Sequence, residues 1–481
     1  MKASQLRSFL CGMLSALLMV AAANVHAAPA GTVLAVRGAA TAKSPDGTVR
    51  VLGRNDNIIE GDVLSTGRKS FAILKFNDGT RMSLRPQTVF QVEQWRTTEN
   101  QESAVTRLFK GGLRAVTGFI AKRNSRAFRV NTSVATIGIR GTTFDARLCD
   151  EDCRLEVAQS SQTDVPRAQT VGRVGFVKGT VTGQKAGSTF VRPITAGSPL
   201  YAGDTITTQT GSFAILIFND RSRVTLRGDS KFVIEEMRYN KNNAEEDSAV
   251  FRLVRGGLRA VTGLIGKRNA RRVRFRTAFA TLGIRGTGFD LVCIDSCGES
   301  EAQAFRIDPL EFLISSAHAQ TGLPPGLLAT PWLNAIYVEV NGRTIDIPEG
   351  KVVFIPLATL VPQELPQMPQ SIPEPKPDEV EVDEQNLFNF QESPEGDPGL
   401  HVACLDGTAC VVGDEIVGAG EMVYTSDDGN VVIKSQYAAG FLVNDKYFKT
   451  VDVPPEVIDL LYEPGSGDGG GDEQPRECTV Q

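Results

Sequence analysis

Six of the eight cysteines lie in closely spaced pairs, a spacing that permits either disulfide formation or metal binding. A structural zinc site would need two such pairs, or one pair with histidines, brought together in space. A disulfide within one pair would instead close a small loop and stabilise a turn. It would stabilise the folded chain by less than the ~3 kcal/mol expected for a loop of about fifteen residues. The disulfide candidates are Cys149 with Cys153, Cys293 with Cys297, and Cys404 with Cys410.

Lys and Arg form a strip with few acids in each half of the chain, although the formal net charge is -5. Clustered positive charge attracts polyanions. The alternative is a solvated strand edge, where Lys and Arg prevent edge-to-edge pairing, and the sequence favours this simpler interpretation. Nucleic acid is not expected, because aromatic side chains for base stacking are sparse there. The candidate polyanion surface comprises Arg107, Lys110, Arg114, Lys122 and Arg123, which continue to Arg126 and Arg129, and Arg252, Arg255, Arg259, Lys267 and Arg268.

Two further arginines, Arg140 and Arg285, lie in the sequence Gly-Ile-Arg-Gly-Thr. The flanking glycines allow close backbone approach, so these arginines could bind an anionic ligand. We favour a structural role, in which each pairs with a nearby carboxylate such as Asp145 or Asp290.

Residues for catalysis are scarce in this sequence. Beyond the N-terminal segment the only histidines are His318 and His401, and neither a Gly-x-Ser-x-Gly nor a His-Glu-x-x-His motif is present. Two acids that cleave a glycan need no fixed spacing, so an envelope glycan hydrolase stays a minor alternative. We therefore predict a protein that is not an enzyme, with no catalytic residues, metal or cofactor.

The N-terminal segment has the features of a secretory signal. Lys2 and Arg7 precede an apolar run over residues 9–23, and small residues lead to a cleavage site after Ala27. The run is shorter than the ~20 residues of a spanning helix, and no later stretch is long enough. We expect an exported protein, periplasmic or secreted, without a membrane span in the mature chain. Cysteines pair in such compartments, which favours the disulfides over zinc.

Long segments of the chain recur about 140 to 145 residues later. Ordered matches over such a period indicate duplicated domains rather than a solenoid. Residues 31–38, 70–85, 107–124 and 133–145 return as 172–179, 212–227, 252–269 and 278–290.

Each copy has the pattern of short β-strands, because runs of Val, Ile, Phe and Thr are separated by turn residues. Residues 70–84 predict a hairpin whose turn contains Gly79. The second copy has Arg221 at that position, so a turn that needs positive φ would have to use Asn219 or Asp220. We predict an all-β fold.

The duplicated motifs resemble the FecR domain, named after the ferric-citrate regulator. They are an opening Gly-x-Val-x-x-Val-x-Gly strand, the Gly-Asp turns at Gly61 and Gly203, and a final Ala-Thr-x-Gly-Ile-Arg-Gly-Thr-x-Phe-Asp. The resemblance covers residues 31–145 and 172–290 and implies two tandem extracytoplasmic modules of β-sandwich or β-roll type. In the namesake regulators an anti-sigma segment and a membrane helix precede the domain. We expect this chain to act without them.

The resemblance also implies closing strands after Arg-Gly-Thr-x-Phe-Asp, which here lie far along the chain. Both 335–357 and 399–460 fit, and the sequence does not assign them to a module. The expected organisation is a signal peptide (1–27), module 1 (28–155), module 2 (156–300), a partly helical or irregular insert (301–334), closing strands (335–357), a linker (358–398), a small β element (399–460) and a disordered tail (461–481).

The linker is rich in proline and acid, which predicts a flexible tether that could fold back onto the basic strips. Cys478 in the tail is a spare thiol or forms an intermolecular bond. The expected function is non-enzymatic binding or scaffolding in the bacterial envelope, with peptidoglycan, lipopolysaccharide or an envelope receptor protein as the partner. The alternative is an extracytoplasmic regulator that relays a signal to a separate membrane receptor.

Overall fold

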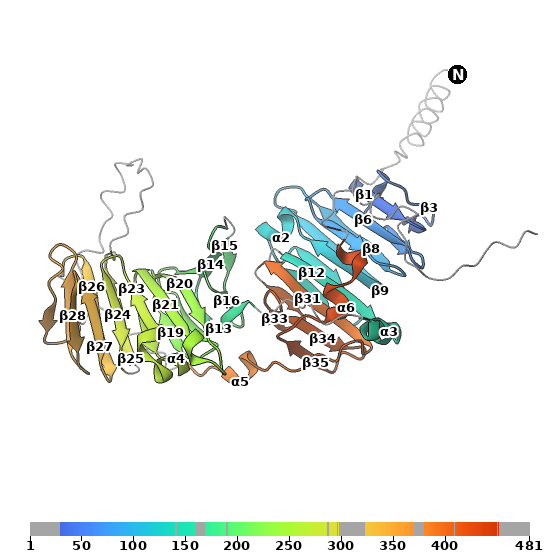
Figure 1. The fold of residues 1–481 in the computed structure, drawn as a ribbon. Helices are drawn as coiled ribbons and strands as arrows, with labels where there is room; N and C mark the ends of the chain where they lie inside the picture. The colour runs from blue at the N-terminus through green and yellow to red at the C-terminus, as the bar shows by residue number, and fades with distance from the viewer. Residues whose placement is uncertain are drawn as a thin grey trace, which may run out of the picture.

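The computed structural model describes residues 29–139, 142–159, 169–188, 191–285, 288–295, 297, 323–369, 380–407, 409–449 and 451. Strands dominate these residues, which confirms the predicted all-β fold class. The strands form two β modules that lie side by side (Figure 1). The predicted signal segment with Ala27, together with Arg140, His318 and Cys478, falls outside the described residues.

Module 1 consists of two packed sheets that share one long strand, β9 (Ser103–Val116). Its first sheet runs in spatial order through β4 (Asn57–Ile59), β1 (Pro29–Arg37), β6 (Phe71–Phe76), β7 (Arg81–Leu84), β9, β12 (Thr142–Cys149), β31 (Gly399–Gly407), β34 (Met422–Ser426) and β35 (Val432–Ser435). Its second sheet runs through β3 (Val49–Val51), β2 (Ala40–Lys43), β5 (Val63–Thr66), β8 (Val89–Arg96), β9, β10 (Phe128–Asn131), β11 (Thr136–Ile139), β32 (Cys410–Val412) and β33 (Glu415–Val417).

Module 2 repeats this order strand for strand. Its first sheet runs through β16 (Pro199–Tyr201), β13 (Thr170–Lys178), β18 (Phe213–Phe218), β19 (Arg223–Leu226), β22 (Gly257–Val261), β25 (Gly288–Ile294), β26 (Gly326–Leu333), β29 (Val352–Pro356) and β30 (Gln363–Leu365). Its second sheet runs through β15 (Val191–Pro193), β14 (Val181–Lys185), β17 (Asp204–Thr208), β20 (Lys231–Arg238), β21 (Ser248–Arg255), β23 (Val273–Arg276), β24 (Ala280–Ile284), β27 (Ile336–Val340) and β28 (Arg343–Ile347).

The two modules are nested, which resolves the assignment of the closing strands. In module 1, β12 pairs antiparallel with β31 from the far end of the chain, and β11 pairs with β32. In module 2, β25 pairs with β26 and β24 with β27. Module 2 is therefore inserted between the two parts of module 1. Its closing strands begin at Gly326, so part of the expected irregular insert is β-strand, because residues 326–333 complete the hydrogen bonds of β25.

Alternating side chains build a separate core between the sheets of each module. In β6, Ala72, Leu74 and Phe76 are all buried in the core of module 1. The core of module 2 takes its buried residues only from 174–355, whereas that of module 1 includes Leu400, Val402 and Val423. The core of module 1 therefore depends on the C-terminal segment.

The helices are short and lie at the sheet margins. They are α2 (Phe119–Arg123), α3 (Asp152–Gln159), α4 (Leu264–Arg268), α5 (Glu384–Leu387), α6 (Gly440–Val443) and α7 (Lys446–Lys449), with 3-10 turns η2 (Ala244–Glu246) and η3 (Ala270–Arg272). The outer face of the first sheet of module 1 is covered by α3 and α6 (Figure 1). Ion pairs hold this cover: Arg85 Nη2 lies 2.7 Å from Glu156 Oε1, and Arg85 Nε lies 3.0 Å from Asp445 Oδ2.

Arg221 itself adopts the left-handed conformation in the turn between β18 and β19, with φ of 65° against 84° for Gly79. The expectation that Asn219 or Asp220 would supply positive φ was wrong. The turn retains its hydrogen bonds: the Arg221 N–H donates to the Phe218 carbonyl at 2.8 Å, and Asp220 Oδ1 accepts from the Ser222 N–H at 2.9 Å. These bonds offset the cost of a non-glycine residue with positive φ.

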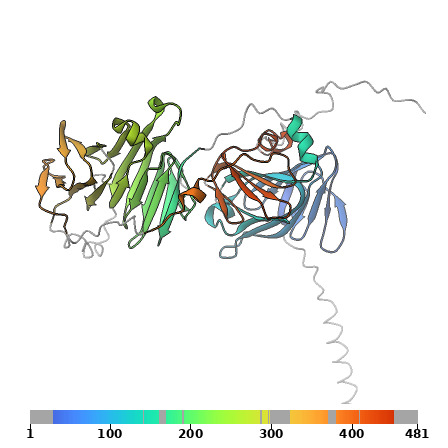
Figure 2. The same cartoon turned by 90° about the horizontal axis from the view of Figure 1, so that it is seen from below.

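The described end of the expected tether does not hang free: α5 lies against module 2, whereas Gln391 and Pro398 form hydrogen bonds with Lys434 and Tyr424 of module 1. In both views α5 sits between the modules (Figure 1, Figure 2). Glu384 Oε1 lies 3.3 Å from Arg223 Nη2, and the Arg221 guanidinium stacks 4.5 Å from the Phe388 ring centroid. The acidic segment thus pairs with arginines at the β18–β19 turn rather than with the basic strips.

A buried polar contact joins the start of module 2 to the closing segment of module 1. Glu421, fully buried, accepts hydrogen bonds from Arg173 and, at 2.7 Å, from the Thr170 hydroxyl. The Tyr201 hydroxyl accepts from the Ala419 N–H at 3.0 Å, and burial raises the pKa of Tyr201. These hydrogen bonds cross from one module to the other and add to bonds within each module, such as the one that the Gly418 N–H donates to Glu421.

Candidate functional site

Strand alternation divides the predicted basic strips between two environments. Arg114 of β9 and Arg259 of β22 make bidentate pairs with Asp145 and Asp290, at 2.6 and 2.7 Å in module 1 and 2.7 and 2.8 Å in module 2. The Arg114 side chain is 7% exposed and that of Arg259 12%. Their inclusion in the polyanion surface was wrong, because both point to sheet faces where a carboxylate neutralises them.

Four more cations of the strips are already paired with acids. Arg107 pairs with Glu93 and Arg252 with Glu235 in the two modules. Arg123 pairs with Glu102 at 2.9 Å, and Arg268 with Asp247 at 3.4 Å. These pairs occur at equivalent positions of the repeat, so they are part of the duplicated fold. Lys110 and Arg255 are exposed where the shared strand bends from one sheet to the other.

The predicted pairing of Arg285 with Asp290 was also wrong. Arg285 follows β24 in the second sheet, whereas Asp290 lies in β25 of the first sheet, so the chain changes sheets between them. Arg285 Nη2 instead lies 2.8 Å from Asp346 Oδ1, with both side chains more than half exposed. The carboxylates of the repeat are held by Arg114 and Arg259, which lie on the neighbouring strand in register with them.

A smaller set of exposed cations makes no ion pair with another described residue. They lie at the same place in each module, on the short helix, on the turn after it and on the parallel strand that follows: Lys122, Arg126 and Arg129 in module 1, and Lys267, Arg271 and Arg274 in module 2. We call these two sets the basic edges. The predicted strips named four of these six cations, without Arg271 and Arg274, and only the sheet geometry separates them from the paired cations.

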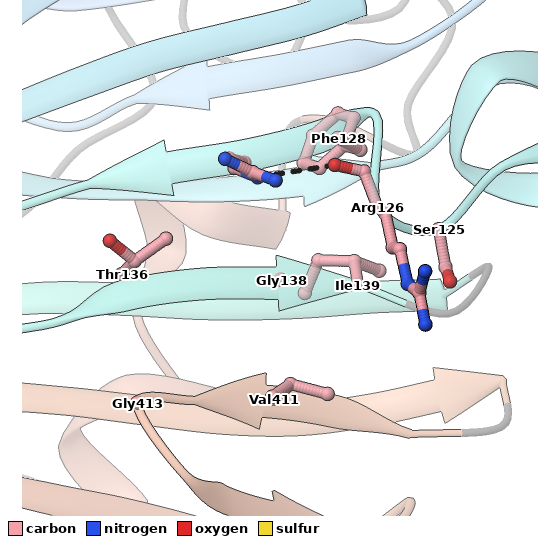
Figure 3. A pocket seen from close by; sticks show the side chains of 9 residues that line it. Ser125, Arg126, Phe128, Thr136, Gly138, Ile139, Val411 and Gly413 are labelled. Carbon is pink, nitrogen blue, oxygen red and sulfur yellow. Dashed lines mark hydrogen bonds between the residues drawn. The ribbon is translucent and has the colours of Figure 1, made fainter.

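A cavity of about 240 Å³ lies next to the basic edge of module 1 (Figure 3). Its walls come from β10, β11 and the closing strand β32, and it is lined by Ser125, Arg126, Phe128, Arg129, Thr136, Gly138, Ile139, Val411 and Gly413. Arg129 Nε donates a hydrogen bond to the Arg126 carbonyl at 3.1 Å, and both arginines line the cavity. The lining includes no acid. Sequence analysis missed this site because Val411 and Gly413 belong to the distant closing segment.

The family model described as FecR protein matches residues 62–161 and 204–305. The chain carries two tandem FecR domains. Both matched ranges end before the closing strands of their module, which the structure adds to each FecR domain.

Two solved chains, both of a candidate anti-sigma factor from Parabacteroides distasonis, are similar to parts of this chain at 10% identity, with TM-scores of 0.23 and 0.22. In each case the match covers 34% of this chain and 61% of the other. No curated protein matches the chain.

All three predicted cysteine pairs of the FecR domains are disulfides. Cys149–Cys153 and Cys293–Cys297 follow the last motif strand of each domain, and Cys404–Cys410 joins β31 to β32 across the corner between the two sheets of module 1. The described residues contain no cluster of three or more potential metal ligands.

His401, the one histidine among the described residues, is a core residue of the first FecR domain. Its ring packs against Tyr424 and Phe441, and Nε2 lies 2.9 Å from the Asp397 carbonyl oxygen. Burial lowers the pKa of His401 to about 4, so the imidazole is neutral at pH 7 and donates from Nε2. Among the described helices, none has the length and apolar character required to cross a membrane.

Proposed function

We propose that this protein is an exported, non-enzymatic binding protein of the bacterial envelope, in which the basic edges of both FecR domains recognise an acidic partner. The observation that carries the proposal is the duplication of three exposed cations without ion pairs to described residues, whereas six other arginines of the strips are paired with acids. Clustered charge of one sign raises the local concentration of an oppositely charged partner. The three disulfides support an oxidising compartment.

The match to the FecR family favours a second candidate, an extracytoplasmic signalling regulator. Its acidic partner would then be the outer domain of a separate membrane receptor, rather than peptidoglycan or lipopolysaccharide. The two candidates share a binding surface and differ in the class of partner.

The test is a pull-down from envelope extract with the mature protein, followed by washes at rising salt. Charge reversal of Lys122, Arg126 and Arg129 together should reduce recovery of the partner about tenfold at low salt. A matched variant reverses Lys43, Lys75 and Lys178, which are exposed away from the basic edges, and should retain the partner. Equal recovery by both variants would refute the proposal. Identification of the retained partner as a receptor or a glycan separates the two candidates.

A further inference from the structure

The two FecR domains differ at one position of the second sheet. In module 1, Gly138 of β11 faces Val411 of β32, and in module 2 the equivalent Gly283 of β24 faces Tyr337 of β27. A Cβ atom added to Gly283 would come within 2.0 Å of Tyr337 Cζ, so the ring lies flat over that glycine. At Gly138 the nearest neighbour, Val411 Cβ, would be 3.7 Å away. The space that an aromatic ring fills in module 2 is thus open in module 1.

The charges around this position also differ between the domains. Gly413 of module 1 follows β32 opposite Thr136, and its counterpart in module 2 is Glu339, opposite Thr281. The open position in module 1 therefore has Arg126 and Arg129 in its lining and no acid there. Module 2 carries its own aromatic ring and its own carboxylate at the equivalent places.

We propose that the module 1 cavity binds an aromatic side chain of a partner protein segment, with a carboxylate next to that residue paired to Arg126 or Arg129. The inference deepens the proposed function and rests on it, since it assigns the acidic partner to a protein. An apolar cavity of about 150 Å³ is large enough for benzene, so about 240 Å³ accommodates a phenol ring. The two guanidinium groups can pair with the carboxylate and contact the ring face.

The test measures binding of two synthetic acidic heptapeptides to the full mature chain by fluorescence anisotropy at low salt. One peptide carries a central Tyr between Glu residues, and the other carries Ala at that position. We expect the Tyr peptide to bind roughly tenfold or more tightly, as for a buried aromatic anchor. Val411→Tyr, which copies the Gly–Tyr pair of module 2, should abolish this preference and leave the salt-dependent binding of the Ala peptide unchanged.

Val432→Tyr is the matched control, because it adds the same side chain to an exposed strand position in the other sheet. It should keep the tenfold preference. Gly138→Val fills the cavity from the opposite strand and should act like Val411→Tyr, with thermal unfolding confirming that both variants are folded. Equal binding of both peptides to the wild type, or a preference that survives both cavity variants, would overturn the inference while the proposed function stands. Binding of neither peptide, with no effect of reversing Arg126 and Arg129 on partner capture, would overturn both.

Discussion

At the scale of single residues, burial decides what each arginine of the repeat does. Arg285 lies five residues before Asp290 in the sequence, yet Arg259, on the neighbouring strand, holds this carboxylate in a pair that is almost fully buried. Arg285 pairs with Asp346 in solvent. Disrupting a buried ion pair lowers the free energy of unfolding much more than disrupting an exposed one.

We therefore expect Arg259→Met to lower the free energy of unfolding by about 3 kcal/mol, because it removes the bidentate partner of a buried carboxylate. Arg285→Met should cost less than about 1 kcal/mol. Urea unfolding of both variants, followed by circular dichroism, checks the difference. Equal losses of unfolding free energy in the two variants would show that the buried ion pair stabilises the fold no more than the exposed one.

His401 gives module 1 a dependence on pH. Its pKa is about 4 in the folded chain and about 6.5 when unfolded, so between these values the unfolded state binds more protons. The contribution of neutral His401 to the free energy of unfolding is fully present above about pH 6.5 and falls as the pH drops toward 4. At pH 5 about 2 kcal/mol of it is lost. Melting temperatures from pH 4 to 8 measure the effect, and His401→Phe should flatten this part of the profile. A His401→Phe profile with an unchanged slope would contradict the assignment.

At the scale of elements, the local motifs were predictable and the non-local pairings were not. Alternation in residues 70–84 indicated the β6–β7 hairpin, and the structure has it. No local pattern determines that β12 pairs with β31, because either closing segment offers apolar strands of suitable length. The basic strips show the same limit, since the acids that neutralise Arg114 and Arg107 lie on neighbouring strands and not beside them in the sequence. The cavity over Gly138 depends both on a local motif and on the non-local pairing of β11 with β32, so it was not predicted.

The Cys404–Cys410 disulfide stabilises the corner where the closing segment passes from one sheet to the other. Module 2 makes the same corner between β26 and β27 without a described disulfide, using Asn334 with positive φ. We expect Cys404→Ala with Cys410→Ala to destabilise module 1 by about 2 kcal/mol, from the chain entropy of a short loop. Calorimetry should show the transition of module 2 unchanged, and a shift of that transition instead would refute the assignment.

At the scale of the whole molecule, nesting makes the two FecR domains unequal. Module 2 has every strand of both its sheets between residues 170 and 365, whereas module 1 needs residues from both sides of it. A fragment of residues 169–369 should therefore fold alone, with dispersed amide resonances and a cooperative thermal transition. Residues 29–159 alone should not, because β11 and β12 lose their partners and Val402 and Val423 leave the core.

The control is a chain in which a short flexible linker replaces residues 169–390, so that both parts of module 1 stay connected and Asp397 still accepts from His401. This chain should regain a cooperative transition, although it loses the contact of Glu421 with Arg173. A folded fragment of residues 29–159 would contradict the dependence on the closing segment.

The pairing of β12 with β31 also sets an order of events for the growing or translocating chain. Until the closing segment has been added, the edges of β11 and β12 remain unpaired. While module 2 is still a flexible loop, pairing across it is slow, because a long loop must be closed. After module 2 has folded, α5 packs against β13, the strand that begins this module, so the segment that leads to β31 starts beside it. We therefore expect the inserted FecR domain to fold first and the outer domain to be completed last.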